Sequence, residues 1–324
     1  MLNRRLVLWG AASVALVRAQ AGPGLAQSYP ARPITLIVPF AAGGFNDVIV
    51  RIVTAPMSKT LGVSIIVEND AGAGGTTATA RGAAAPADGY TLIAGSMGTH
   101  GAAPSQYPNL KYDPARDFTP IGLTAEAPAV LVTRKDFPAN TLAEFIDYLR
   151  KNSSTVNEAH AGVGSQMHTY CTLLQSILKT KTARIAYRGG APALNDLVAG
   201  QVDFGCVTLN TAVSQIQGGT VKALAIAGPQ RAAVIADVPT SAEAGLPEFQ
   251  VSGWNAIFAP RNLPPDIQAR LSDALASALE DAATAKRLEE IGCFIPARAD
   301  RTPAALQERV QHDVARWSAV LKRE

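Results

Sequence analysis

The sequence predicts an α/β fold in which two lobes, each a mainly parallel sheet flanked by helices, enclose a cleft. Short apolar runs that suit strands alternate with amphipathic stretches that suit helices over most of the chain, which is the pattern of parallel α/β sheets. Glycine-rich loops follow several of these strands. The segment from Asp117 to Arg134 holds two extended apolar runs with no clear helix between them, as expected where a chain crosses from one lobe to another.

The first residues have the composition of an export signal. Arg4 and Arg5 precede a short apolar run from Leu6 to Val17, and small residues end at Ala26. This is the order of a secretory signal peptide, which we place at residues 1–26, with cleavage near Ala26. Ordinary secretion and twin-arginine export both fit the paired arginines. We therefore expect a periplasmic protein.

The charge balance excludes a nucleic-acid partner. The 324 residues include 29 basic and 26 acidic side chains, a formal charge of +3. Three of the basic residues lie in the predicted leader, which holds no acidic residue, so the mature chain has 26 of each sign. No basic footprint remains. With 48% hydrophobic residues, the chain can bury one large core or two.

The first predicted element is a buried strand that ends at Val38 and runs into the turn Gly43-Gly44. Asn46 and Asp47 are residue types that favour a helix start, and apolar residues follow at helical spacing. A helix start exposes unpaired N–H groups, so it can hold an anion without Lys or Arg. Pro56 predicts a kink or a restart in this helix.

The strand–glycine–helix pattern recurs three times. The strand 65–67 leads to Gly72–Thr77, the loop 161–165 leads into a helix from about Met167, and the strand 185–187 leads to residues 188–192. Several such loops facing one cleft would form a neutral, backbone-lined cradle for a carboxylate.

The remaining elements follow in order. In the first lobe we predict a helix over 78–85, a strand over 90–94 and a loop over 95–100. Thr141 and Glu144 form a capping box that begins the next helix. The second lobe then holds helices 167–178 and 192–198 and strands 184–187, 202–207 and 221–227, and residues 250–258 form the return crossing. We accordingly assign 27–123 with 253–324 to lobe 1 and 124–252 to lobe 2.

These motifs together resemble the Bug or TctC family, the solute-binding proteins of tripartite tricarboxylate transporters. The resemblance runs from the leader to about Trp317 and is carried by Val38–Gly44, Val67–Asn69, Gly72–Gly75, Asp88–Leu92, Lys111–Pro114, Asp117-Phe118, Ala191–Leu197, Asp237–Thr240 and Glu243–Gly245. The stretches Ser96–Gly101 and Ala159–Ser165 are similar to the BugD-type subgroup, which is associated with aspartate.

The resemblance implies a two-lobed, type II-like periplasmic binding protein that closes over a small carboxylate. It implies delivery to membrane subunits of the TctA and TctB type and a role without catalysis, and we expect a monomer. The four histidines show no metal-ligand spacing and the glycine loops no nucleotide-binding motif, so we expect no metal and no cofactor. Carried over by position, the ligand-binding residues are Phe40, Gly43, Gly44, Asn46, Asp47, Gly75, Thr76, Ser96 and Met97 from lobe 1, and Gly164, Ser165, His168, Thr208 and Asn210 from lobe 2.

Two departures from the family pattern bear on the ligand. Phe45 and Asn46 replace the usual small residues, and Val207 stands where BugD-type sequences carry an acid after the residue matching Cys206. An acid in the cleft would pair with a ligand ammonium, so its absence favours a carboxylate without an amine. Phe45 could add an apolar wall, which suits an aliphatic diacid or an aromatic acid.

Several alternatives stay open. A ligand-presenting receptor for a sensor kinase fits the same sequence. A serine hydrolase is a weaker alternative: Ala94–Gly98 nearly matches a nucleophile elbow and His100 is close, but we expect no helix after the turn. His168 can be a cleft donor or a core residue, and Asp47 can pair with Arg51.

The three cysteines, Cys171, Cys206 and Cys293, allow two interpretations. One is a Cys171–Cys206 disulfide, because both residues fall in the same predicted lobe and the periplasm is oxidising. The other is three small buried thiols.

Overall fold

The computed structural model describes residues 29–321, so the predicted signal peptide lies outside the described residues. The strands are β1 (Ile34–Val38), β2 (Ile65–Asn69), β3 (Thr91–Ser96), β4 (Phe118–Arg134), β5 (Asn157–His160), β6 (Ala183–Ala186), β7 (Phe204–Thr208), β8 (Val221–Ile226) and β9 (Ser252–Pro260). The helices are α1 (Phe45–Leu61), α2 (Thr76–Ala83), α3 (Ala103–Gln106), α4 (Leu142–Asn152), α5 (Gln166–Leu178), α6 (Gly190–Val198), α7 (Leu209–Gln217), α8 (Pro265–Glu280), α9 (Ala282–Glu290) and α10 (Pro303–Leu321).

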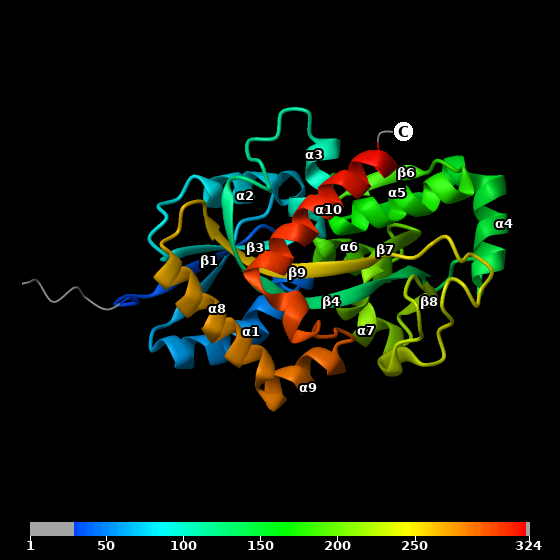
Figure 1. The fold of residues 1–324 in the computed structure, drawn as a ribbon. Helices are drawn as coiled ribbons and strands as arrows, with labels where there is room; N and C mark the ends of the chain where they lie inside the picture. Colours follow the sequence, from blue (N-terminus) through cyan, green and yellow to red (C-terminus); the bar gives the residue numbers. More distant parts are fainter. Residues whose placement is uncertain (1–28, 322–324) are drawn as a thin grey trace, which may run out of the picture.

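The strands form one continuous mixed sheet in the order β2-β1-β3-β9-β4-β7-β5-β6, with β8 also paired to β4. Parallel pairs lie toward the two ends of the sheet, β2-β1-β3 at one end and β7-β5-β6 at the other. The antiparallel strands β4 and β9 join them through the middle of the molecule (Figure 1). The predicted α/β fold class is confirmed.

β4 belongs to both halves of the sheet. Its first part pairs with β9, and its last part, Ala129–Arg134, pairs with β7 and β8. The register between β4 and β9 shifts between Leu123 and Ala125. The predicted crossing over residues 117–134 is therefore a single strand, and the predicted lobe boundary at residue 124 falls at this irregularity. Lobe 1 denotes residues 27–123 with 253–324, and lobe 2 denotes residues 124–252.

Alternate residues of the central strands face opposite cores. Leu92 and Ile257 pack in a cluster with α1 and α8, whereas Ile93 and Phe258 pack in a second cluster that includes α5 and α10. This period of two is what a sheet covered on both faces requires. A third cluster lies under α6 and α7 in lobe 2.

Trp254 ties the return strand to the last helix. Its ring is fully buried, and its Nε1–H donates to Asp313 Oδ2 on α10 at 2.7 Å. Figure 1 shows α10, in red, crossing over β4 and β9. No helix in residues 29–321 is both long enough and apolar enough to cross a bilayer.

Two local details differ from expectation. Of the two outcomes predicted at Pro56, a kink or a restart, the restart does not occur, because Pro56 lies inside one continuous helix, α1. Ten buried side chains hold this helix in place although Pro56 donates no hydrogen bond. A helical segment does follow β3: a π-helical turn, Met97–Ala102, continues into α3. Pro104 is tolerated there because it lies in the first turn of α3, where its missing N–H is not needed.

The predicted Cys171–Cys206 disulfide is not present. The two residues are neighbours, but both are free and buried, and the Cys206 backbone N–H donates to Cys171 Sγ at 3.0 Å. Burial raises the pKa of both thiols, which keeps them protonated and unreactive. Cys293 is also free and buried. The alternative interpretation, three buried thiols, agrees with the structure.

Candidate ligand-binding site

A small cavity of about 30 Å³ lies between the two lobes. It is lined by residues of both lobes: Phe40, Gly44, Phe45, Asn46 and Ser96 from lobe 1, and Ala161, Ser165, Gln166, Met167, Gly190, Thr208 and Thr211 from lobe 2. A molecule held there would touch both lobes at once.

Four helices begin at this cavity. Gly44 precedes α1, Ser165 precedes α5, Gly190 is the first residue of α6, and Thr208 precedes α7. Each helix start carries free N–H groups and the positive end of the helix dipole. The convergence of four such starts makes the cavity a favourable place for an anion, although no charged side chain lines it.

Asp47 holds the first glycine loop in shape from behind the cavity. Its Oδ2 accepts from the Gly43 backbone N–H, and its Oδ1 accepts from Arg51 Nε and Asn69 Nδ2, all at 2.9 Å. Burial raises the pKa of the Asp47 carboxyl, but these hydrogen bonds outweigh burial and keep the pKa below its usual value. The predicted Asp47–Arg51 pair is present in the structure. Asp47 itself does not line the cavity.

Ser96 and Ser165 each cap a helical segment while lining the cavity. Ser96 Oγ accepts from the Thr99 backbone N–H at 3.4 Å, and Ser165 Oγ accepts from the His168 backbone N–H at 3.3 Å. Because Ser165 Oγ accepts from the backbone, its proton remains available as a donor toward the cavity. Ser96 Oγ also lies 3.4 Å from Thr99 Oγ1, so its proton can be donated either to that hydroxyl or toward the cavity.

Gln166 and Thr211 complete the polar lining and were missed by the sequence reasoning. Gln166 Nε2 donates to the Trp254 carbonyl at 2.9 Å, and its Oε1 accepts from Tyr170 Oη at 3.3 Å, so its amide has a fixed orientation. Thr211 Oγ1 lies 3.0 Å from Thr208 Oγ1. Position alone could have pointed to both, since Gln166 follows Ser165 and Thr211 lies three residues after Thr208. Ala161 and Gly190 lie in recognised glycine loops and Met167 at a predicted helix start, but none of the three was selected as a binding residue.

The predicted residues divide into two groups. Phe40, Gly44, Asn46, Ser96, Ser165 and Thr208 line the cavity. The others do not: Gly43 and Asp47 shape the first loop, Met97 lies in the core, and Gly164 and His168 contact lobe 1 across the lobes. Gly75 packs against Phe40, and Thr76 donates to the Ala73 carbonyl, both within lobe 1. Asn210, in the first turn of α7, lies outside the lining set.

Within the described residues, four amide side chains have a buried polar atom without a hydrogen-bond partner: Asn46, Gln106, Asn210 and Asn255. Asn46 Nδ2 has no protein partner, and neither the nitrogen nor the oxygen of the Asn210 amide has one. A buried polar group without a partner destabilises the fold by about 1–3 kcal/mol. Asn46 lines the cavity, so a bound polar molecule could satisfy its donor.

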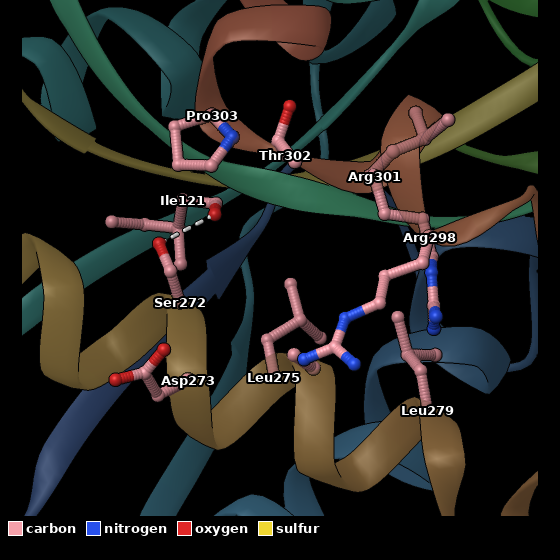
Figure 2. Close-up of a pocket in the computed structure, with 11 residues that line it drawn as sticks. Ile121, Ser272, Asp273, Leu275, Leu279, Arg298, Arg301, Thr302 and Pro303 are labelled. Carbon is pink, nitrogen blue, oxygen red and sulfur yellow. Dashed lines mark hydrogen bonds between the residues drawn. The ribbon is translucent and has the colours of Figure 1, made fainter.

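A larger hollow of about 210 Å³ lies on lobe 1 between β4, α8 and the start of α10 (Figure 2). Figure 2 shows the Arg298 side chain extending over Leu275, and Ser272 donating to the Ile121 carbonyl at 2.8 Å. Arg298 Nε lies 3.4 Å from Glu280 Oε1, and Arg301 Nη2 lies 3.9 Å from the same oxygen. The two arginines of the hollow thus already face the Glu280 carboxylate, and no residue of lobe 2 lines the hollow. We therefore take the cavity between the lobes as the candidate site.

Within residues 29–321, no three His, Cys, Asp or Glu side chains are grouped so that they could hold a metal ion. The donors at the cavity are backbone N–H groups, hydroxyls and amides, which suit hydrogen bonding to an oxyanion rather than binding of a cation.

Comparison with known proteins agrees with this architecture. The family described as "Tripartite tricarboxylate transporter family receptor", TctC, matches residues 49–324. MatC from Rhodopseudomonas palustris, solved with bound malate, is 45% identical with a TM-score of 0.89, over 90% of this chain and 100% of that chain. The periplasmic binding protein BugD is 37% identical with a TM-score of 0.87, over 91% of this chain and 98% of that one.

A second R. palustris protein, solved with adipate, is 32% identical with a TM-score of 0.86, over 91% of this chain and 97% of that chain. The resemblance inferred from the motifs is confirmed. With a family match over most of its length, this chain belongs to the Bug/TctC family of tripartite tricarboxylate transporter receptors.

Proposed function

We propose that this protein is a periplasmic receptor that captures a small carboxylate without an amine, in the first place an aliphatic dicarboxylate, and delivers it to membrane subunits of the TctA and TctB type. The observation that carries this proposal is the convergence of four helix starts from both lobes on one cavity without a charged lining residue.

The physical basis is the cost of removing a carboxylate from water. A buried carboxylate is tolerated only where its lost hydrogen bonds are replaced. Helix-start N–H groups, the Ser96 and Ser165 hydroxyls and the Asn46 amide offer such donors from opposite sides of the cavity. A ligand of the right length would engage donors of both lobes.

The absence of an acid separates diacids from amino acids. Within the described residues, no Asp or Glu lines the cavity, so an ammonium group placed there would lose its hydration without a partner. The relatives solved with malate and adipate support an amine-free ligand. The small volume, together with the rings of Phe40 and Phe45, favours a short aliphatic acid over an aromatic one.

Isothermal titration calorimetry with malate, succinate, adipate, benzoate and aspartate tests this proposal. We expect malate or succinate to bind most tightly, and aspartate to bind at least about tenfold more weakly than either, a difference of about 1.4 kcal/mol. Tighter binding of aspartate than of every amine-free diacid would contradict the proposal. Mass spectrometry of the molecule retained on gently purified protein gives an independent identification.

A pair of serine variants locates the site. Ser165→Ala removes a hydroxyl from the cavity, and Ser272→Ala removes one from the hollow on lobe 1. We expect Ser165→Ala to weaken malate binding about tenfold to 100-fold, since one hydrogen bond to a charged group contributes about 1.5–3 kcal/mol, and Ser272→Ala to leave it unchanged. The reverse pattern would move the site to the hollow.

The same geometry speaks against catalysis. Ser96 Oγ contacts Thr99 Oγ1, and His100 Nδ1 lies 2.9 Å from that same Thr99 oxygen. The His100 ring stacks on Phe258, with ring centroids 4.1 Å apart. We infer a binding protein rather than a serine hydrolase. A role in presenting ligand to a sensor kinase remains an alternative, which deletion of the protein, with uptake and transcription both measured, distinguishes from transport.

A further inference from the structure

We propose that Gln106 and Tyr107, at the end of α3 in lobe 1, form a latch that holds lobe 2 closed and thereby sets how slowly a ligand leaves. Neither residue lines the cavity, so they act as positioning residues. The proposal deepens the proposed function, since it takes ligand release to require separation of the lobes.

Tyr107 joins backbone groups of the two lobes. Its Oη lies 2.5 Å from the Val163 carbonyl oxygen in lobe 2 and 2.8 Å from the Ala73 carbonyl oxygen in lobe 1. A hydroxyl has one proton, so the two carbonyls share it. The ring also packs against the lobe 2 loop, because a Cβ placed on Gly164 would lie 2.5 Å from Tyr107 Cε2.

Gln106 makes a second contact across the lobes. Its Oε1 lies 3.2 Å from His168 Nδ1 on α5, and the other ring nitrogen, Nε2, lies 3.5 Å from Arg184 Nη1. Arginine can only donate, so Nε2 accepts and Nδ1 carries the proton that is donated to Gln106. The neutral form of His168 therefore supports both contacts.

The backbones beneath the latch touch so closely that only glycine fits. A Cβ on Gly74 would lie 1.7 Å from the Val163 oxygen, and a Cβ on Gly162 would lie 2.9 Å from Gly74 N. A third cross-lobe contact, from the Ala41 N–H to the Arg188 carbonyl at 3.2 Å, lies at the second pair of glycine loops. The latch thus adds side-chain hydrogen bonds to the main-chain contacts between these glycine loops, separately from the Gln166 hydrogen bond to the Trp254 carbonyl, which also joins the two lobes.

The segment of lobe 2 that the latch holds also contains residues that line the cavity. Val163 and His168 bracket Ser165, Gln166 and Met167, which line the site. The latch contacts exist only while the lobes touch, so they stabilise the closed state and not the open one. Loss of such contacts shows in the dissociation rate more than in the association rate.

The test compares Tyr107→Phe with Tyr112→Phe, a matched control. Tyr112 Oη donates to the Thr99 carbonyl at 2.7 Å, entirely within lobe 1. With malate as the probe in stopped-flow experiments, we expect Tyr107→Phe to raise the dissociation rate about threefold to tenfold, with association unchanged. Gln106→Ala, as a second variant, raises it in the same way, and Tyr112→Phe leaves it at the wild-type value.

Hydrogen exchange of the ligand-free protein tests the latch without any ligand. We expect Tyr107→Phe to speed exchange in peptides covering residues 72–76 and 162–168, and Tyr112→Phe to leave these peptides unchanged. If malate does not bind the wild type, the proposed function fails on that point, while the exchange data still decide the latch. Wild-type exchange in both Tyr107→Phe and Gln106→Ala, or equal changes in Tyr112→Phe, would overturn the latch.

Discussion

The cavity between the lobes and the hollow on lobe 1 differ in a way that teaches how this fold recognises an acid. The hollow is seven times larger by volume, about 210 Å³ against 30 Å³, and it holds two arginines. Those arginines already face Glu280. The cavity has no charged lining residue but gathers four helix starts from both lobes. Converging donors from both lobes, and not size or formal charge, distinguish the cavity as the candidate site.

The largest expected effect is obtained by preventing the lobes from meeting. In Gly74→Ala the new methyl group would lie 1.7 Å from the Val163 oxygen, so closure over the cavity is blocked. We expect malate affinity to fall about 100-fold, or about 2.7 kcal/mol, by calorimetry. Gly62→Ala is the matched control: its φ of +75° carries similar backbone strain, but a Cβ there meets nothing within 4 Å. Equal losses in both variants would mean that strain, not closure, is responsible.

The next largest effect concerns His168, near the cavity, and the pH dependence of the free energy of unfolding. Burial lowers the pKa of His168 to about 3, with the charges of His160 and Arg184 adding to it, against about 6.5 in the unfolded chain. Below pH 6.5 the His168 imidazole is protonated in the unfolded chain but stays neutral in the folded protein. The free energy of unfolding therefore falls as the pH drops toward 3. The slope is up to about 1.4 kcal/mol per pH unit.

Urea unfolding at pH 7, 6 and 5 measures this slope. In His168→Asn we expect the slope to decrease by up to that amount. His100, which is buried and has its pKa lowered to about 3 by burial, remains in this variant and keeps part of the wild-type slope. An unchanged slope would show that His168 does not resist protonation in the folded protein.

A smaller effect is expected from loosening the first glycine loop. Asp47→Ala removes three hydrogen bonds that hold the loop but takes nothing from the cavity lining. We expect about fivefold weaker malate binding, since the hydrogen bonds that hold the loop contribute about 1 kcal/mol to its shape. Glu280→Ala, beside the hollow, is the counterpart and leaves affinity unchanged. Wild-type affinity in Asp47→Ala would remove Asp47 from any role in binding.

The smallest effect is expected at the hollow itself. Arg298→Gln removes a cation whose side chain is 78% exposed and whose partner is Glu280. An exposed ion pair contributes about 0–1 kcal/mol, so we expect little change in stability and malate affinity within about twofold of the wild type. A large loss of affinity would reverse the comparison between the two regions.

Much of the architecture could be predicted because the periodicity of the sequence is strong. The strand and glycine turn before α1 and the extended segment that became β4 both follow from local composition. The helical turn after Ser96 was missed because Gly98, Gly101 and Pro104 disfavour helices locally, whereas tertiary packing and the Ser96–Thr99 capping box form it here. α1 runs through Pro56 for the same tertiary reason.

The site was predicted in part. Residues at helix starts, such as Asn46 and Ser165, are visible as sequence signals. Which residues of a loop face inward depends on how the lobes meet, and no local pattern encodes that. Gly164 and His168 thus belong to the seam between the lobes rather than to the cavity wall, and Gln166 and Thr211 enter the lining only through the arrangement of their helices.

Because both halves of the sheet include β4, the two halves are expected to melt together. This strand pairs with β9 along Phe118–Pro128 and with β7 and β8 along Ala129–Arg134. Melting of either half would strip partners from a strand that the other half needs. We expect differential scanning calorimetry to record one cooperative endotherm for the whole chain, despite its bilobal form, and two resolved peaks would show that the halves come apart independently.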